Sequence, residues 1–328
     1  MSTMRAAVIR RPGPPSVLRV EDRPIPTPQK GEVLIRIKAC GLNRSELFTR
    51  RGDSGDAVPF PRVLGIECCG LVSKCPGGEL AESAIVATAM GGLGRKFDGG
   101  YAEYTCAPVA NVVKLGETKL EWKVLGAVPE MLQTAYGSLF RSLKWKAGET
   151  LLVRGGTTSV GLAAAAIAKK HGAKAVIGTS RKSGREELMK GAGMDHIVID
   201  SGSVMAEVRK LFPDGVDKVL ELVGTTSLRD SLRCVKTGGV CCMTGIVGNA
   251  WAMKEFSPFE DIPTEVYFTT YQGDQVDFVN TPLEEMMQQI QKGELPVQIG
   301  KVFDLEDIVA AHEVMEENKA GGKVVVVM

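Results

Sequence analysis

The first third of the chain alternates apolar and charged residues over short stretches, a pattern typical of half-buried β-strands. The clearest example is EVLIRIKA at residues 32–39. Further strands are predicted at 5–9, 17–20 and 84–89, and one short helix at 44–50. The pattern therefore indicates a β-rich domain with little regular helix over residues 1–122.

From residue 123 onwards, short apolar runs alternate with helix-forming segments. Strands are predicted at 151–153, 175–177, 197–199, 218–223, 239–244 and 267–270, and helices at 122–127, 131–143, 162–170, 186–191, 204–212, 228–235 and 283–292. Such alternation predicts a parallel, doubly wound α/β sheet over residues 123–294. Two late strands, at 302–303 and 323–327, flank a helix at 305–317. We expect them to rejoin the N-terminal domain, which then comprises 1–122 and 295–328.

The first strand of the second domain runs into a glycine-rich turn, Gly155-Gly156-Thr-Thr-Ser-Val-Gly161, which opens an Ala-rich helix. Backbone N–H groups and a helix N-terminus then meet at one point, which suits a pyrophosphate. Because a strand precedes the turn and a helix follows it, we interpret it as a dinucleotide-binding motif. A plain tight turn is the alternative.

The end of the next strand bears on the choice of cofactor. NAD sites usually place Asp or Glu there, about 20 residues after the glycines. This chain instead has Ser180, Arg181 and Lys182, followed by Arg185. These side chains can donate to a 2′-phosphate that a carboxylate would repel, so the sequence favours NADP(H). The alternative is that they are ordinary solvated charges of a loop.

Composition and charge narrow the classes of function. The 328 residues are 44% hydrophobic and 24% charged with a net charge of +1, so no partnership with nucleic acid or an anionic membrane is expected. The chain has no apolar run long enough for a membrane span, and MSTMRAAVIRR at its start lacks a signal-peptide core, so we expect a cytoplasmic protein. The eight cysteines lack a C-x-x-C pair and the three histidines lack ligand spacing, so both are expected to be structural.

Seven segments together carry a family resemblance. They are ACGLNRSELFTRRG (39–52), PRVLGIECCGLV (61–72), GGYAEY (99–104), TAYGSL (134–139), RGGTTSVGLAAAAIAK (154–169), VDKVLELVG (216–224) and VFDLEDIVAAHEVMEENKAGGKVVV (302–326). In these segments the chain resembles the zinc-independent branch of the medium-chain dehydrogenase/reductase family, of the quinone oxidoreductase (zeta-crystallin) type. The resemblance covers essentially the whole chain. It implies a GroES-like catalytic domain, a Rossmann cofactor domain and an active-site cleft between them.

The positions that bind zinc in the related alcohol dehydrogenases hold other residues here. Asn43 stands where those enzymes have a ligand cysteine, and Ile66 stands where they have a ligand histidine. Neither side chain can replace a thiolate or an imidazole on Zn²⁺. A structural zinc would need four clustered cysteines, and residues 73–98 contain only Cys75. We therefore expect no bound metal.

Without a Lewis acid, the favoured acceptors are those that take hydride readily, such as quinones and α,β-unsaturated carbonyl compounds. The acceptor oxygen then needs a hydrogen-bond donor, and Asn43 is the first candidate, with a helix cap as its alternative role. The resemblance places Arg50 near the cofactor, so Asn43 and Arg50 are the candidate catalytic residues. Phe48 stands where quinone reductases often have Tyr, which suggests protonation by water. Asp200, where relatives commonly have Tyr near the adenosine phosphate, counts against NADPH.

The resemblance also implies a set of cofactor contacts. They are Gly156, Ser159, Val160 and Gly161 at the pyrophosphate; Ser180, Arg181 and Arg185 at the 2′-phosphate; Thr134, Val223, Gly224, Gly245, Ile246 and Val247 elsewhere at the cofactor edge; and Asn318 and Lys323 in the tail.

These observations predict an NADPH-dependent reductase that transfers hydride to a small-molecule quinone or enone without zinc. A polyketide-type enoyl reductase is one alternative, and a low-turnover NADPH-binding structural or regulatory protein is another. The strands near 239–247 and 267–270 are expected to form a sheet edge that pairs across a twofold axis, which would give a homodimer.

Overall fold

The computed structural model describes residues 2–328, which form two compact units. Unit 1 contains the residues up to Gln133 with Gly273–Lys292 and Ile299–Met328, and unit 2 contains Thr134–Gln272 and Gly293–Gln298. These limits differ from the predicted boundaries at 122/123 and 294/295. One reason is helix α2 (Trp122–Ala127), which packs so closely on strand β3 (Glu32–Gly41) that a Cβ on Gly126 would lie 2.5 Å from the Cβ of Ala39.

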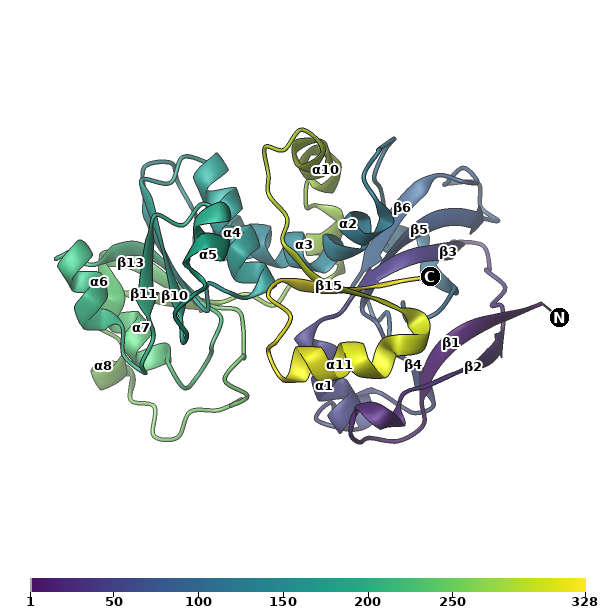
Figure 1. Cartoon of the computed structure of the whole chain (residues 1–328), viewed down its shortest axis with the longest axis horizontal. Coiled ribbons are helices and arrows are strands. Elements are labelled where there is room, and N and C mark those ends of the chain that lie inside the picture. The colour runs from purple at the N-terminus through teal and green to yellow at the C-terminus, as the bar shows by residue number, and fades with distance from the viewer. Residues whose placement is uncertain (1) are drawn as a thin grey trace. The chain divides into compact units, whose positions relative to one another are not determined.

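Unit 1 is built on two β-sheets (Figure 1). The smaller sheet has the order β2-β1-β4, with β1 at Thr3–Ile9, β2 at Arg19–Pro24 and β4 at Arg62–Val63. The larger sheet has the order β15-β16-β3-β5-β6-β8, and β7 also pairs with β3. Its other strands are β5 (Glu67–Lys74), β6 (Ile85–Ala89), β7 (Tyr104–Pro108), β8 (Val112–Lys114), β15 (Ile299–Asp304) and β16 (Lys323–Val327). Because Val326 pairs antiparallel with Cys40, the late strands rejoin the N-terminal sheet as predicted.

Short helices cover the sheets of unit 1. They are η1 (Pro15–Val17), α1 (Arg44–Arg51), η2 (Gly55–Ala57), η3 (Val109–Asn111), α9 (Gln275–Val279), α10 (Leu283–Gln291), η5 (Leu305–Asp307) and α11 (Ile308–Glu316). Helix α3 (Pro129–Gly137) begins in unit 1 and ends in unit 2. Ala7, Ile35 and Val326 are fully buried in the core, so the alternating strands turn their apolar faces inward as their sequence pattern predicts.

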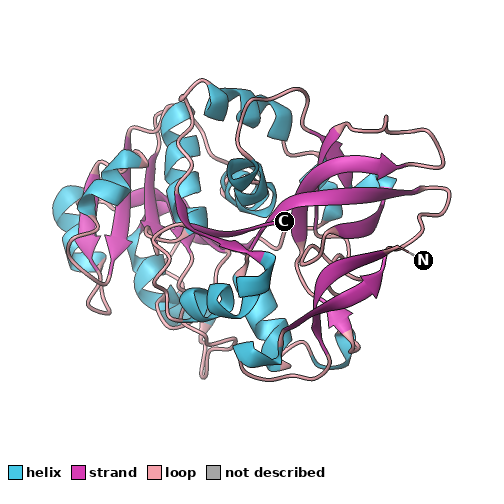
Figure 2. Ribbon diagram, turned by 45° about the vertical axis from the view of Figure 1, so that its right-hand side comes forward, coloured by secondary structure: helices cyan, strands magenta, loops and turns pink. Residues whose placement is uncertain are grey.

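Unit 2 is a parallel six-stranded sheet of order β11-β10-β9-β12-β13-β14, with helices on both of its faces (Figure 2). Its strands are β9 (Thr150–Arg154), β10 (Ala175–Ser180), β11 (His196–Ile199), β12 (Val216–Glu221), β13 (Val235–Met243) and β14 (Tyr267–Thr270). Its helices are a π-helix (Ser138–Ser142), α4 (Ser159–Lys170), α5 (Glu186–Gly191), α6 (Met205–Leu211), α7 (Leu228–Cys234) and α8 (Pro258–Asp261). The predicted doubly wound sheet is confirmed. Its strand order reverses between β9 and β12, where such sheets bind ligands at the carboxyl ends of their strands.

Across residues 2–328, none of the helices combines the length and the apolar character that a membrane crossing requires. All eight cysteines are free, and six of them are buried.

Candidate functional site

The glycine turn of unit 2 is shaped by a capped helix. Gly155 has a φ of +90°, which glycine adopts without the steric cost that a side chain adds. Thr158 is the N-cap of α4: its Oγ1 accepts from the Gly161 N–H at 3.0 Å and donates to the Gly155 carbonyl at 2.8 Å. A Cβ on Gly161 would lie 2.7 Å from that carbonyl oxygen, so a larger residue would push the helix away from the strand.

The four residues predicted at the pyrophosphate divide into two kinds. The N–H of Gly156 donates to the Thr179 carbonyl at 3.0 Å, and the N–H of Gly161 is held by Thr158. These two glycines therefore allow close packing rather than supply donors. Ser159 and Val160 occupy the first two positions of α4, where N–H groups have no acceptor within the helix. Their N–H groups, at the positive end of the helix dipole, suit a phosphate.

The basic segment after β10 has side chains free to bind an anion. The Ser180 hydroxyl donates to the Lys182 carbonyl at 2.7 Å and accepts from its N–H at 3.2 Å, which turns the chain back on itself. Arg181 and Lys182 are exposed and Arg185 is partly exposed. Within residues 2–328, none of these three cations has an ion-pair partner. Their positive charges are therefore available to an anion.

The ends of β12 and β13 approach each other at the same edge of the sheet. Glu221, which is fully buried, accepts the N–H groups of Val223 at 2.6 Å and Gly224 at 2.8 Å through one carboxylate oxygen. Burial raises the pKa of Glu221, and hydrogen bonds from Ser231 and Gly224 oppose that rise. A Cβ on Gly245 would lie 2.4 Å from the Leu222 carbonyl, so the segments after the two strands are in contact.

The other predicted contacts of unit 2 lie at this edge as well. The Val247 N–H donates to the Leu222 carbonyl at 3.1 Å, and Ile246 lies between Gly245 and Val247. The Ser138 hydroxyl donates to the Thr134 carbonyl at 2.6 Å and lies 2.9 Å from the hydroxyl of Thr244, just beyond β13. The structure thus brings together the predicted residues of unit 2 at one edge. Whether they contact a cofactor stays a prediction.

A buried polar cluster occupies the position in unit 1 where related enzymes bind zinc. Lys323 lies 2.7 Å from an oxygen of Glu67 and donates to Asn43 Oδ1 at 2.6 Å. Asn43 Nδ2 donates to Glu67 at 2.8 Å and lies 3.5 Å from Glu46. The other oxygen of Glu67 accepts the backbone N–H of Glu130 at 2.8 Å. Asn43, Glu46, Glu67 and Lys323 are all buried, so this cluster joins α1, β5, α3 and β16 out of contact with water.

The charges in this cluster shift the pKa values of its members. Burial raises the pKa of Glu46 from 4.5 to about 7, although its bond from the Ile66 N–H and the charge of Lys323 oppose the rise. Burial lowers the pKa of Lys323, but attraction to Glu67 and Glu130 outweighs it and leaves that pKa above its ordinary value. The cluster therefore holds Lys323 charged and Glu46 close to half-protonated near neutral pH.

The cluster and its surroundings bear on three of the predicted roles, each of which stays a prediction. Asn43 stands at the N-cap of α1, but its side chain makes no capping bond, and its amide is occupied by Glu67, Glu46 and Lys323. The structure therefore supports neither the donor role nor the capping role. Lys323 is enclosed with its ammonium on Glu67, and its cofactor contact stays a prediction. The guanidinium of Arg50 is fully buried 2.9 Å from Glu316 of α11, so it ties two helices together rather than facing a substrate.

Asn318, the remaining predicted contact, lies exposed just beyond α11 with a φ of +54°. Its side-chain oxygen accepts a hydrogen bond from Arg44 at the start of α1. That bond joins two elements of unit 1, and a cofactor contact of Asn318 stays a prediction.

Sequence reasoning missed two buried acids, Glu67 and Glu221, that organise these sites. Each interrupts an apolar strand, in GIECCGLV and KVLELV, and each is fully buried. An acid inside an apolar run is a usable signal, because a carboxylate enters a core only when it is paired or hydrogen-bonded. Its partners cannot be read from the run itself.

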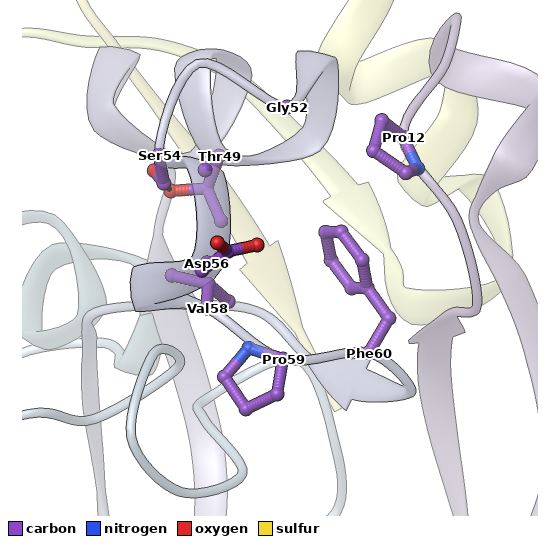
Figure 3. Close-up of a pocket in the computed structure, with 9 residues that line it drawn as sticks. Pro12, Thr49, Gly52, Ser54, Asp56, Val58, Pro59 and Phe60 are labelled. Carbon is purple, nitrogen blue, oxygen red and sulfur yellow. Dashed lines mark hydrogen bonds between the residues drawn. The ribbon is translucent and has the colours of Figure 1, made fainter.

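Unit 1 also has a surface pocket of about 520 Å³ beyond α1 (Figure 3). Pro12 and Phe60 stand on one side of it, and Thr49, Ser54 and Asp56 on the other. The Thr49 and Ser54 hydroxyls are 3.0 Å apart. None of the residues predicted from the sequence as functional lines this pocket.

Comparison with known proteins shows what this chain is similar to. Two family models match: an alcohol dehydrogenase GroES-like domain over residues 29–117 and a zinc-binding dehydrogenase over residues 192–326. Curated quinone oxidoreductases of Pongo abelii and Homo sapiens are each 29% identical to the chain, over 99% of its length and 98% of theirs. A solved structure, mycobacterial Rv1454c complexed with NADPH, matches with a TM-score of 0.87 at 27% identity, over 99% of this chain and 100% of that one.

The fold is that of the medium-chain dehydrogenase/reductase family, and the chain is similar in sequence to its quinone oxidoreductases. Members are oxidoreductases that use a nicotinamide cofactor, and unit 2 has the features that fit one: free N–H groups at the start of α4 and unpaired cations after β10. Unit 1 contains the GroES-like domain matched by the family model.

The donor set does not fit the zinc ion of the family's alcohol dehydrogenases. Ile66 offers only hydrocarbon, the amide of Asn43 is occupied by its neighbours, and burial raises the pKa of the Cys40 thiol well above its ordinary value. The described chain, residues 2–328, has no group of three or more His, Cys, Asp or Glu side chains placed to hold a metal ion. The family model described as zinc-binding matches residues 192–326, which exclude positions 43 and 66.

Proposed function

We propose that this protein is an NADPH-dependent reductase that transfers hydride to a quinone or an α,β-unsaturated carbonyl compound without zinc. Its support is the similarity to quinone oxidoreductases over nearly the full length of the chain, together with the donor set at Asn43 and Ile66. The eight free cysteines favour a reducing compartment, and we place the protein in the cytoplasm.

The preference for NADPH rests on one observation, the unpaired cations after β10. Within residues 2–328 neither Arg181 nor Arg185 forms an ion pair, and the carboxylate typical of NAD sites is missing from this segment. A guanidinium group can bind a phosphate with two parallel hydrogen bonds. NADH has a hydroxyl in place of the 2′-phosphate and cannot accept this pair of bonds.

The chain's own residues have two tasks in this proposal. The N–H groups of Ser159 and Val160 bind the pyrophosphate. Arg181 and Arg185 bind the 2′-phosphate, so the adenosine part of the cofactor is held at both of its phosphate groups. The cofactor, when bound, supplies the hydride. The amide of Asn43 is occupied and the side chain of Arg50 is fully buried, so we assign the proton that completes the reduction to water.

Cofactor titration of a double variant tests the preference. R181A/R185A should weaken NADPH binding at least about tenfold and leave NADH binding within about twofold, because only NADPH carries the charge that these cations meet. K190A is the matched control, since Lys190 is an exposed cation on neighbouring α5. Equal losses of NADPH and NADH binding in the double variant would contradict the proposal.

A low-turnover NADPH-binding protein is the second candidate. The observation that favours it is the saturation of Asn43, whose amide is occupied by Glu67, Glu46 and Lys323. NADPH binding with no consumption across a range of quinones and enones would favour this candidate over the reductase.

A further inference from the structure

A buried arginine lies directly beneath the glycine turn of unit 2. Arg154, the last residue of β9, is fully buried. Its guanidinium contacts the segment after β11 and the start of α7. Nε and Nη2 each lie 2.9 Å from an oxygen of Asp200, so the pair is bidentate. Nη1 bonds to Asp230 on α7 and lies 3.3 Å from the Ser231 hydroxyl. This is an unusual place for a cation, because a buried charge is stable only when it is paired.

Asp200 lies beside the segment that we assign to the 2′-phosphate. Ser180 pairs with Ile199 in the register of β10 and β11, and the Asp200 N–H donates to the Ser180 carbonyl at 2.8 Å. A carboxylate at this edge would repel a phosphate bound by Arg181 and Arg185. The sequence counts Asp200 against NADPH on other grounds, because relatives commonly have Tyr at this position.

Arg154 removes that conflict. Both carboxylate oxygens of Asp200 face its guanidinium, one of them also accepts the Gly202 N–H at 3.0 Å, and the Asp200 side chain is only 9% exposed. Among residues 2–328, Asp200 has no other cationic partner. Asp230 is less dependent on Arg154, because Ser203 and the Val204 N–H also donate to it.

We propose that Arg154 is a specificity-determining residue: it neutralises Asp200 and so lets the edge of the sheet accept a 2′-phosphate. The inference rests on the proposed function, since it concerns which nicotinamide dinucleotide unit 2 binds. Arg154 acts through Asp200 and is therefore a positioning residue that does not itself contact the cofactor.

Three variants test this role through the ratio of NADPH to NADH affinity, measured by titration of each dinucleotide. R154M removes the cation that faces Asp200, so the negative charge of Asp200 should repel the 2′-phosphate. The affinity for NADPH relative to NADH should then fall about tenfold. R154M/D200N removes that charge and should restore the ratio to within about threefold of wild type. D200N alone should leave the ratio within about threefold, because both oxygens of Asp200 already face the guanidinium of Arg154. A purely structural Arg154 would change both affinities together and leave the ratio constant.

Each result decides. A folded R154M with the wild-type ratio overturns the inference, and so does a D200N ratio that rises about tenfold, because Asp200 would then repel the phosphate despite Arg154. If R154M fails to fold, R154Q, which is also uncharged but keeps a side-chain donor for Asp200, takes its place under the same criteria. If the wild-type protein binds neither dinucleotide, the proposed function fails and this inference with it. If it binds both and only the R154M result fails, the proposed function stands.

Discussion

Gly41 shows how little room the buried cluster of unit 1 leaves at a single position. A Cβ there would lie 2.3 Å from a carboxylate oxygen of Glu67 and 2.5 Å from Cε of Lys323. G41A should therefore displace the ion pair and destabilise the protein by about 1–3 kcal/mol, the usual cost of overpacking. Thermal unfolding measures the change. G191A is the control, because nothing lies within 4 Å of a Cβ at that position, and its effect should stay within about 0.5 kcal/mol. Equal melting temperatures for G41A and wild type would contradict the packing described here.

Glu46 gives the protein a pH dependence with a definite sign. Its folded-state pKa of about 7 lies above the ordinary 4.5, so the folded state holds the proton more tightly than the unfolded state does. The resulting stability is complete below pH 4.5 and is lost as the pH rises through 7.

The variant E46Q is neutral at every pH and lacks this loss. The difference in free energy of unfolding, E46Q minus wild type, should therefore increase by up to about 3 kcal/mol when the pH is raised from 4.5 to 8. Urea unfolding at the two pH values measures it. His312, whose burial lowers its pKa to about 3, titrates in both proteins and cancels in the difference. A stability difference independent of pH would show that folding does not raise the pKa of Glu46.

At the residue scale, the sequence predicts that positions 43 and 66 hold no zinc ligand, but it does not show what these residues do instead. Asn43 and Lys323 bond to each other although 280 positions separate them, and no local pattern links the two. The expected roles of Asn43, Arg50 and Lys323 came from the resemblance, and each side chain is instead held by partners on distant elements.

The N-terminus of α4 is the element on which the cofactor site depends most. Thr158 holds both the Gly161 N–H and the Gly155 carbonyl, so T158V should remove the cap and the tie across the turn together. We expect a loss of stability of about 1 kcal/mol and weaker binding of NADPH and NADH alike. Thermal unfolding and titration of both dinucleotides measure the two effects.

The neighbouring variant T157V is the control for the stability measurement, and its melting temperature should match that of wild type. If T158V bound both dinucleotides as tightly as wild type, the geometry of the turn would not depend on this cap.

At the element scale, periodicity predicts the strands well and the irregular helices poorly. The helix predicted at 131–143 ends as an α-helix at Gly137 and continues as a π-helix, beside a point where a Cβ on Gly137 would lie 2.0 Å from the Tyr271 hydroxyl. The strand predicted at 17–20 begins only at Arg19, because Pro15 starts a 3₁₀ turn. The first departure depends on a tertiary contact, and the second on turn chemistry that the apolar pattern hides.

At the scale of the whole molecule, β14 is the exposed end of the sheet of unit 2. It pairs with β13 on one side only, and Tyr267 on it is 63% exposed. An edge strand with open hydrogen-bonding groups can pair with a second copy. We therefore expect light scattering to give twice the chain mass of 35.1 kDa.

A charged side chain on that edge should prevent the pairing. Y267K is expected to give the monomer mass, because lysine is the usual guard of a free strand edge. V302K places the same charge on β15, an edge strand of unit 1, and should leave the mass unchanged. A monomeric wild-type protein would refute the expected dimer.

The central claim concerns hydride transfer from NADPH, and steady-state consumption of the two cofactors tests it most directly. The wild-type protein is given NADPH or NADH with a panel of small quinones and α,β-unsaturated carbonyl compounds, and absorbance of the reduced nicotinamide is followed. The account predicts consumption with at least one acceptor and a kcat/KM for NADPH at least about tenfold above that for NADH. Binding of NADPH without consumption by any acceptor, or a preference for NADH, would contradict it.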